Sequence, residues 1–93
     1  MITLLSRPGC HLCDEALREL QAWLDRHRTP GDELTVEVVD IESDPELHRR
    51  YLERIPVIRV DGRDVCEFAF DSGAFQSALR DRRRKSGPGR VRW

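Results

Sequence analysis

The first third of the chain changes from a short, mostly apolar run to a helical repeat. Residues 2–5 form a short apolar run that Arg-Pro-Gly at residues 7–9 ends, which indicates a buried strand followed by a loop. From Cys13 onward apolar residues recur at spacings of three and four, with charged residues on the other side. This repeat predicts a helix that ends near His27.

The middle of the chain predicts a second strand and a short second helix. Thr-Pro-Gly-Asp at residues 29–32 is typical of a turn, and residues 34–41 are rich in the β-branched side chains that strands favour. The crossover of a strand-helix-strand unit makes its two strands parallel in nearly all proteins, so the loop before the helix lies at the carboxyl edge of the sheet. Asp-Pro-Glu near the start of residues 44–54 predicts the second helix.

Two further strands follow as a hairpin. Residues 56–60 and 65–70 flank Asp61-Gly62, a dipeptide strongly favoured in two-residue turns between antiparallel strands. Together the elements predict an α/β fold, with a four-stranded mixed sheet flanked by three helices in the order βαβ-α-ββ-α.

The C-terminal part predicts a last helix and then a tail. Asp71-Ser72 can cap a helix whose apolar positions continue to Leu79, after which basic residues replace the apolar repeat. A chain of 93 residues has room for one core only. We therefore predict one domain over residues 1–83 and a basic, flexible tail over residues 84–93.

Composition excludes several function classes. A formal net charge of −1 gives no dominating field, and the basic C-terminus lacks the interleaved aromatic residues on which bases stack, so we expect no nucleic-acid partner. No apolar run approaches the roughly 18 residues that span a bilayer, and the N-terminal run is too short for a signal-peptide core. We expect a cytoplasmic protein without a membrane partner.

A close pair of cysteines carries the candidate chemistry. In a reducing cytosol such a pair indicates redox catalysis or metal binding rather than a structural disulfide. Cys10 and Cys13 flank the start of the predicted helix, which puts both sulfurs on one side of its first turn. Because a helix N-terminus favours a thiolate, Cys10 is the predicted nucleophile and Cys13 the resolving thiol. Arg7 and His11 could add positive charge, although His11 is as easily an exposed residue without a role.

Zinc is the main chemical alternative for this pair. A structural zinc site needs four ligands, and the remaining candidates are scattered without ligand spacing: Cys66, His11, His27 and His48. We therefore predict a redox pair and no metal site.

Cys66 alternates with aromatic residues along its strand, which is typical of a small buried thiol. Asp40 is predicted to cap the turn after its strand rather than to move a proton at Cys13.

Two segments resemble one superfamily. The sequence RPGCHLC at residues 7–13 resembles the active-site loop of glutaredoxins, and IPV at residues 55–57 resembles the segment that carries the cis-proline of the glutaredoxin and thioredoxin superfamily. The resemblance covers residues 2–79 and is greatest to small glutaredoxin-like proteins. It implies the thioredoxin/glutaredoxin fold, a cis-proline at Pro56 beside the cysteine pair, and a backbone at Ile55 that pairs with substrate.

The resemblance also implies binding roles and shows departures. It places substrate contacts at Ile55 and Pro56. We predict further substrate contacts around the cysteine pair at Arg7, His11 and Leu12. Dithiol glutaredoxins have Pro-Tyr between the cysteines where this chain has His-Leu, so the direction of electron flow stays open. The Gly-Gly turn of glutathione-binding members is missing from residues 67–73, and the sequence therefore does not predict a glutathione site.

The sequence thus predicts a monomeric thiol-disulfide oxidoreductase that acts on protein or small-molecule disulfides. The Cys10–Cys13 disulfide would be its redox group, without a further cofactor. The alternative is that glutathione or another small thiol serves as a cofactor. A thiol or flavoprotein reductase would supply electrons. The rival functions are a zinc or iron-sulfur module that uses the same pair, and a redox-inert interaction domain.

Overall fold

The computed structural model describes residues 1–27 and 34–86 of the chain. Its elements, in order, are β1 (Ile2–Ser6), α1 (His11–Arg26), β2 (Val36–Asp40), the short 3-10 helix η1 (Ile41–Ser43), α2 (Pro45–Tyr51), β3 (Val57–Val60), β4 (Arg63–Glu67) and α3 (Ser72–Ser86). Apart from η1, this is the predicted order. Within these residues no helix is long and apolar enough to cross a membrane.

The four strands form one mixed sheet in the order β2-β1-β3-β4. As predicted, β1 and β2 are parallel and β3 and β4 are antiparallel, while β1 also pairs antiparallel with β3. Leu5 pairs with Val57, and Val57 pairs with Glu67. The end of β1, the start of β3 and the end of β4 therefore meet at one edge, which we call the active edge.

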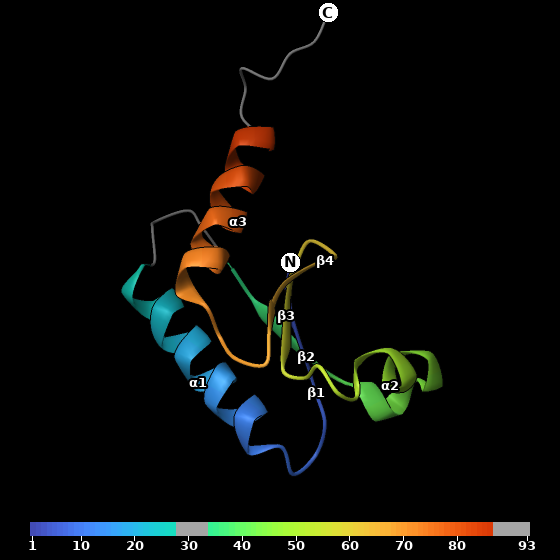
Figure 1. Cartoon of the computed structure of the whole chain (residues 1–93). Coiled ribbons are helices and arrows are strands. Elements are labelled where there is room, and N and C mark those ends of the chain that lie inside the picture. The colour runs from blue at the N-terminus through green and yellow to red at the C-terminus, as the bar shows by residue number, and fades with distance from the viewer. Residues whose placement is uncertain (28–33, 87–93) are drawn as a thin grey trace, which may run out of the picture.

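Helices cover both faces of the sheet (Figure 1): α1 and α3 lie on one face and α2 on the other. The larger core cluster packs Leu20 of α1 and Phe75 of α3 against Ile2 and Leu4. The smaller cluster packs Leu5 against α2. Alternate β1 residues thus face opposite helices, which explains why apolar residues occur on both faces of this strand.

The hairpin turn has the expected conformation. Asp61 and Gly62 have φ values of 51° and 86°, and two consecutive left-handed residues are what the favoured two-residue hairpin turn requires. Glycine at the second place removes the steric cost of that conformation. The N-terminal amino group donates to the Asp61 carboxylate at 2.6 Å, which ties the beginning of β1 to this turn.

The second helix is shorter than predicted. It ends at Tyr51 rather than at residue 54, because the chain must turn there to enter the Ile55–Pro56 bond. The N–H groups of Arg54 and Ile55 both donate to the Tyr51 carbonyl, at 2.8 and 3.1 Å, which closes the turn. Helical backbone is also sterically disfavoured at the residue before a proline. Local sterics and the tertiary path of the chain therefore both end the helix before Pro56.

The prediction that the fourth strand reaches residue 70 is wrong. β4 ends at Glu67, and Phe68 has a φ of 72°, which breaks the alternation along the strand. Cys66 is buried as predicted, but Phe68 is exposed instead of lying beside it. Phe70 is half-buried and contacts Phe75, with ring centroids 5.5 Å apart.

The last helix begins as predicted and ends later. Asp71 caps it: its carboxylate accepts from the N–H of Ala74 at 3.1 Å and its carbonyl from the N–H of Phe75 at 3.0 Å. Because α3 continues through Ser86, residues 84–86 of the predicted tail are helical. The rest of that tail and the predicted turn at residues 29–32 fall outside the described residues.

Candidate active site

Cys10 is the N-cap residue of α1. The loop from β1 reaches it through Gly9, whose φ of 77° gives the sharp turn into the helix. The Cys10 backbone is extended, its carbonyl accepts from the N–H of Asp14 at 3.1 Å, and its sulfur accepts from the N–H of Cys13 at 3.1 Å. The sulfur therefore occupies the place of a capping oxygen and lies at the positive end of the helix dipole.

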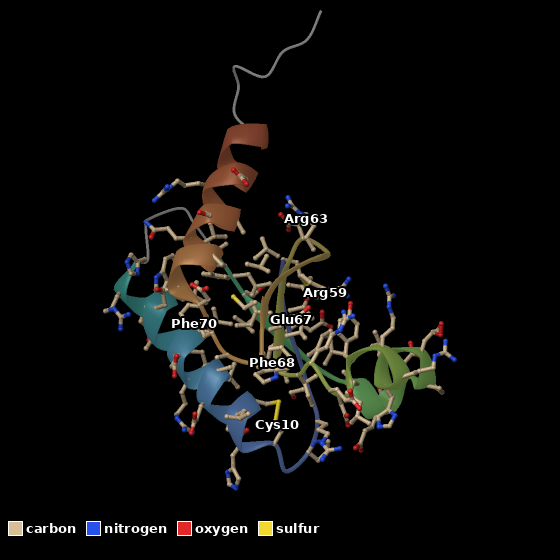
Figure 2. The ribbon with its side chains drawn as sticks, in the orientation of Figure 1. Cys10, Arg59, Arg63, Glu67, Phe68 and Phe70 are labelled. Atoms are coloured by element: carbon tan, nitrogen blue, oxygen red, sulfur yellow. A yellow bond between two sulfur atoms is a disulfide. The ribbon has the colours of Figure 1, made fainter. Side chains whose placement is uncertain are left out.

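The two cysteines form a disulfide, with Cα atoms 5.2 Å apart. Figure 2 shows the bond at the start of α1. The two sulfurs differ in access, because Cys13 is only 2% exposed whereas Cys10 is half-buried. A reagent from solution can thus approach the pair from the Cys10 side only.

The predicted cis-proline is present at the active edge, in residues 53–56, which we call the cis-proline loop. The Ile55–Pro56 peptide bond is cis, and Pro56 is fully buried. Because Leu5 pairs with Val57, the end of β1 that leads to Cys10 and the start of β3 that follows Pro56 lie at the same edge. The Ile55 N–H donates to the Tyr51 carbonyl at 3.1 Å and is therefore already used within the protein. Backbone pairing of Ile55 with a substrate stays a prediction, and it would use the Ile55 carbonyl as the acceptor.

Three other predicted binding residues lie at the surface around the pair. Arg7 precedes the turn at Gly9, and His11 and Leu12 are the first residues of α1. All three side chains are exposed. Their roles in substrate binding stay predictions.

Phe68 is a residue of this edge that sequence reasoning missed. Its backbone N–H donates both to the Pro56 carbonyl at 2.8 Å and to the Arg54 carbonyl at 3.2 Å, which holds it against the cis-proline loop. In Figure 2 it lies at the same end of the molecule as Cys10. A signal was available, because glutathione-binding glutaredoxins have a Gly-Gly turn after the fourth strand, where this segment lies, and a left-handed residue is typical of a turn.

Two tempting residues have the structural roles that were predicted for them. Cys66 lies in the larger core cluster, and its thiol donates to the Asp71 carbonyl at 3.6 Å. Burial raises the pKa of the Cys66 thiol, because the thiolate would lose its water. The carboxylate of Asp40 accepts from the N–H of Glu42 at 2.8 Å and so caps η1.

The histidines are not gathered at the pair. His27 stacks on Trp23 with ring centroids 4.0 Å apart at the far end of α1, and His48 lies in α2. In the described segments no three His, Cys, Asp or Glu side chains are grouped so that they could hold a metal ion.

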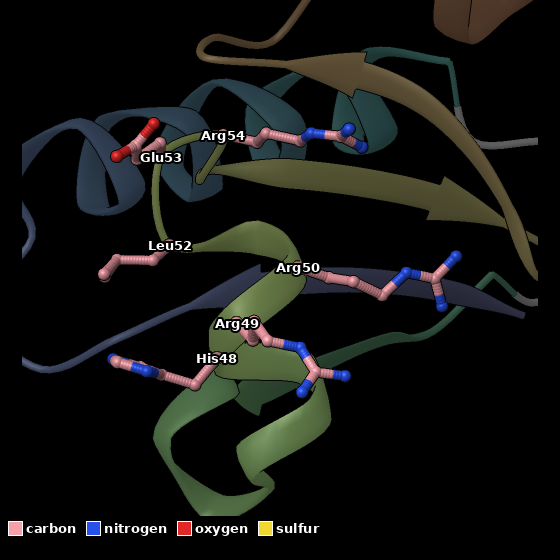
Figure 3. A pocket seen from close by; sticks show the side chains of 6 residues that line it. All are labelled: His48, Arg49, Arg50, Leu52, Glu53 and Arg54. Carbon is pink, nitrogen blue, oxygen red and sulfur yellow. The ribbon is translucent and has the colours of Figure 1, made fainter.

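A pocket of about 550 Å³ opens between α2 and the cis-proline loop. Its walls, drawn in Figure 3, are His48, Arg49, Arg50, Leu52, Glu53 and Arg54. Much of its positive charge is compensated, since Arg49 pairs with Glu46 at 2.7 Å and Arg54 with Glu67 at 3.8 Å. This pocket depends on the path of the chain after α2, which no pattern in the sequence predicts.

Solved structures resemble this arrangement. Protein XcR50 from X. campestris is 30% identical, with a TM-score of 0.65 over 87% of this chain and 97% of that one. Protein Ne2328 from Nitrosomonas europaea is 26% identical, with a TM-score of 0.69 over 83% and 87%. Reduced glutaredoxin from Escherichia coli, at 21% identity and a TM-score of 0.52 over 86% and 93%, shares the fold.

A search of the curated proteins finds no match to the chain. The model of the family described as Glutaredoxin-like domain (DUF836) matches residues 1–80, which include every strand, the cysteine pair and the cis-proline. The chain therefore belongs to the Glutaredoxin-like domain (DUF836) family, as a thioredoxin-like α/β fold that carries a Cys10–Cys13 disulfide.

Proposed function

We propose that the protein is a dithiol thiol-disulfide oxidoreductase in which Cys10 attacks and Cys13 resolves. The observation that carries the proposal is the unequal access of two sulfurs in one disulfide: Cys13 is buried in the first turn of α1, and Cys10 is partly exposed. An exchange enzyme needs this asymmetry, because a foreign disulfide must meet the attacking thiol first and the resolving thiol second.

The surroundings of Cys10 support its role as nucleophile. Only a thiolate attacks a disulfide, and an N-cap position offers it backbone N–H groups and the partial positive charge of the helix. The hydrogen bond from the Cys13 N–H to the Cys10 sulfur is already in place in the oxidised protein. The same donor would stabilise the negative charge on Cys10 once the pair is reduced.

The proposed cycle has two exchanges. The Cys10 thiolate attacks one sulfur of the substrate disulfide, so that a bond between Cys10 and that sulfur forms while the substrate bond breaks and its second sulfur leaves as a thiolate, which takes up a proton. Cys13, as a thiolate, then attacks Cys10 and expels the first substrate sulfur. Two electrons have passed to the substrate, and the Cys10–Cys13 disulfide remains. A thiol or flavoprotein reductase would return two electrons to it.

A single-turnover experiment with cysteine variants tests the proposal. Pre-reduced Cys13→Ser protein is mixed with bis(2-hydroxyethyl) disulfide and examined by intact mass spectrometry. We expect a lasting adduct of one hydroxyethylthio group on Cys10, because the second exchange is blocked, whereas wild type ends as oxidised protein without an adduct. Cys10→Ser should form no adduct at Cys13 at a comparable rate, since that sulfur is buried. If Cys13→Ser reduces the disulfide to completion as fast as wild type, the resolving role is wrong.

A further inference from the structure

The backbone of Phe68 is unusual for a large residue. Its φ of 72° lies in the left-handed region, where a side chain with a β-carbon is crowded and glycine is not. Such outliers persist only where the surroundings fix them, and they gather at functional sites. Here the fixing contacts are the two hydrogen bonds from the Phe68 N–H to the carbonyls of Arg54 and Pro56, which lie on either side of Ile55.

This conformation exposes the ring instead of packing it. The Phe68 side chain is 55% exposed, although the next aromatic residue, Phe70, turns inward to contact Phe75. The Phe68 N–H already donates to the carbonyls of Arg54 and Pro56. The turn therefore presents an aromatic surface beside the cis-proline rather than an N–H group for a polar ligand.

Three exposed apolar residues belong to segments that border the active edge. In the part of the chain that the structure describes, the large exposed hydrophobic residues are Met1, Leu12, Val38, Leu52 and Phe68. Leu12 lies beside Cys13 in α1, Leu52 precedes the cis-proline loop, and Phe68 follows β4; we call these three residues the apolar rim. Figure 3 shows Leu52 pointing away from the guanidinium groups of Arg50 and Arg54. By contrast, Met1 lies at the opposite end of β1, and Val38 in the middle of β2.

We propose that Phe68 is the specificity contact for protein substrates that carry a large apolar side chain next to the attacked cysteine. The inference rests on the proposed function, which requires the substrate to cover the surface around Cys10 during the mixed-disulfide step. Burying apolar area against the rim stabilises a protein segment with an apolar neighbour and gives nothing to a small polar thiol. An aromatic ring with few rotatable bonds supplies such a contact at low entropic cost.

Two matched peptides test this assignment. Both are closed by the same internal disulfide and differ only in having Phe or Ser beside the attacked cysteine, and pre-reduced protein converts each in a single turnover. We expect wild type to reduce the Phe peptide about tenfold faster than the Ser peptide. In Phe68→Gly the ratio of the two rates should fall close to one. The matched control Val38→Thr removes an exposed apolar residue from β2 and should keep the wild-type ratio.

A second variant guards against a loss of folding in Phe68→Gly. Phe68→Asn introduces a residue that tolerates the left-handed conformation. Its ratio of Phe-peptide rate to Ser-peptide rate should also fall close to one. A wild-type ratio near one, or an unchanged ratio in both variants, overturns the inference while the oxidoreductase activity stands. An equal fall for both peptides would also overturn it, because Phe68 would then serve the exchange itself.

Two other outcomes are separable from these. If wild type reduces neither peptide nor bis(2-hydroxyethyl) disulfide, the proposed function itself fails and this inference fails with it. If sedimentation shows a concentration-dependent dimer that Phe68→Gly abolishes, the rim is covered by a second copy of the chain, and the assignment to substrate is wrong.

Discussion

The three cysteines of this chain differ in expected reactivity, because they differ in burial and in the polar group nearest to the sulfur. Cys10 replaces a capping oxygen at a helix end, Cys13 is buried in the first turn of that helix, and Cys66 lies in the core. Desolvation is the main cause that raises the pKa of the Cys66 thiol above its ordinary value of 9.0. A thiol that resists ionisation and is 3% exposed should take no part in exchange.

The raised pKa of Cys66 predicts a pH dependence of stability. Well below pH 9.0 the thiol is protonated in both the folded and the unfolded chain, so its contribution is complete. As the pH rises further, the unfolded chain loses this proton first, and the contribution falls. We expect oxidised wild type to exceed Cys66→Ala by about 1 kcal/mol in free energy of unfolding at pH 7. That difference should shrink between pH 9 and pH 10.5 in urea titrations, and a constant difference would contradict the assigned cause.

The end of α2 is fixed by contacts with the sheet rather than by its own sequence. Tyr51 is buried, and its hydroxyl donates to the Asp64 carboxylate of β4 at 3.0 Å. Arg59 Nε lies 3.0 Å from the same carboxylate, and the Tyr51 carbonyl accepts from the N–H of Ile55. One residue thus joins α2, β4 and the cis-proline loop, and we expect it to set the position of that loop.

Removing only the hydroxyl of Tyr51 should weaken this joint measurably. Tyr51→Phe keeps the buried ring and loses the hydrogen bond to Asp64, and we expect a cost of about 1 kcal/mol in the free energy of unfolding. Asp64 keeps Arg59 as a partner, so no isolated charge is left. Asp64→Asn serves in a double-mutant cycle, in which coupling between the two positions is expected. Strict additivity of the two substitutions would show that the hydrogen bond contributes nothing.

The sheet is shared by two core clusters, so both faces should unfold together. The larger cluster includes Leu20 of α1, and the smaller one includes Ile41 on the α2 face, both fully buried. Neighbouring residues of β1 belong to different clusters, as Leu4 and Leu5 show. Loss of packing on one face therefore disturbs the strand that supports the other.

Core truncations on the two faces test this cooperativity. Leu20→Ala and Ile41→Ala should each cost about 3 kcal/mol, since both leave a cavity among buried neighbours. In each variant tryptophan fluorescence and far-UV circular dichroism should follow one urea transition with an unchanged slope. Val38→Thr, at an exposed site, should stay within about 0.5 kcal/mol of wild type. Separate transitions for the two probes would mean that the α2 face unfolds on its own.

Local rules sufficed for much of this protein. Helix and strand order follows from hydrophobic period, the hairpin from Asp61-Gly62, and the N-cap of α3 from Asp71, because each depends on neighbours in sequence. The spacing of Cys10 and Cys13 predicted a pair on one turn for the same reason. The cis bond at Pro56 came from resemblance rather than from a local rule.

Tertiary structure decided what depends on segments that are distant in sequence. The ends of α2 and β4 are set where the chain must pass the cis-proline, and the left-handed Phe68 is held by carbonyls of Arg54 and Pro56. The pocket beside α2 and the unequal exposure of the two active-site sulfurs arise only when the elements are packed. No sequence period encodes these features, because burial and long-range hydrogen bonds are properties of the assembled fold.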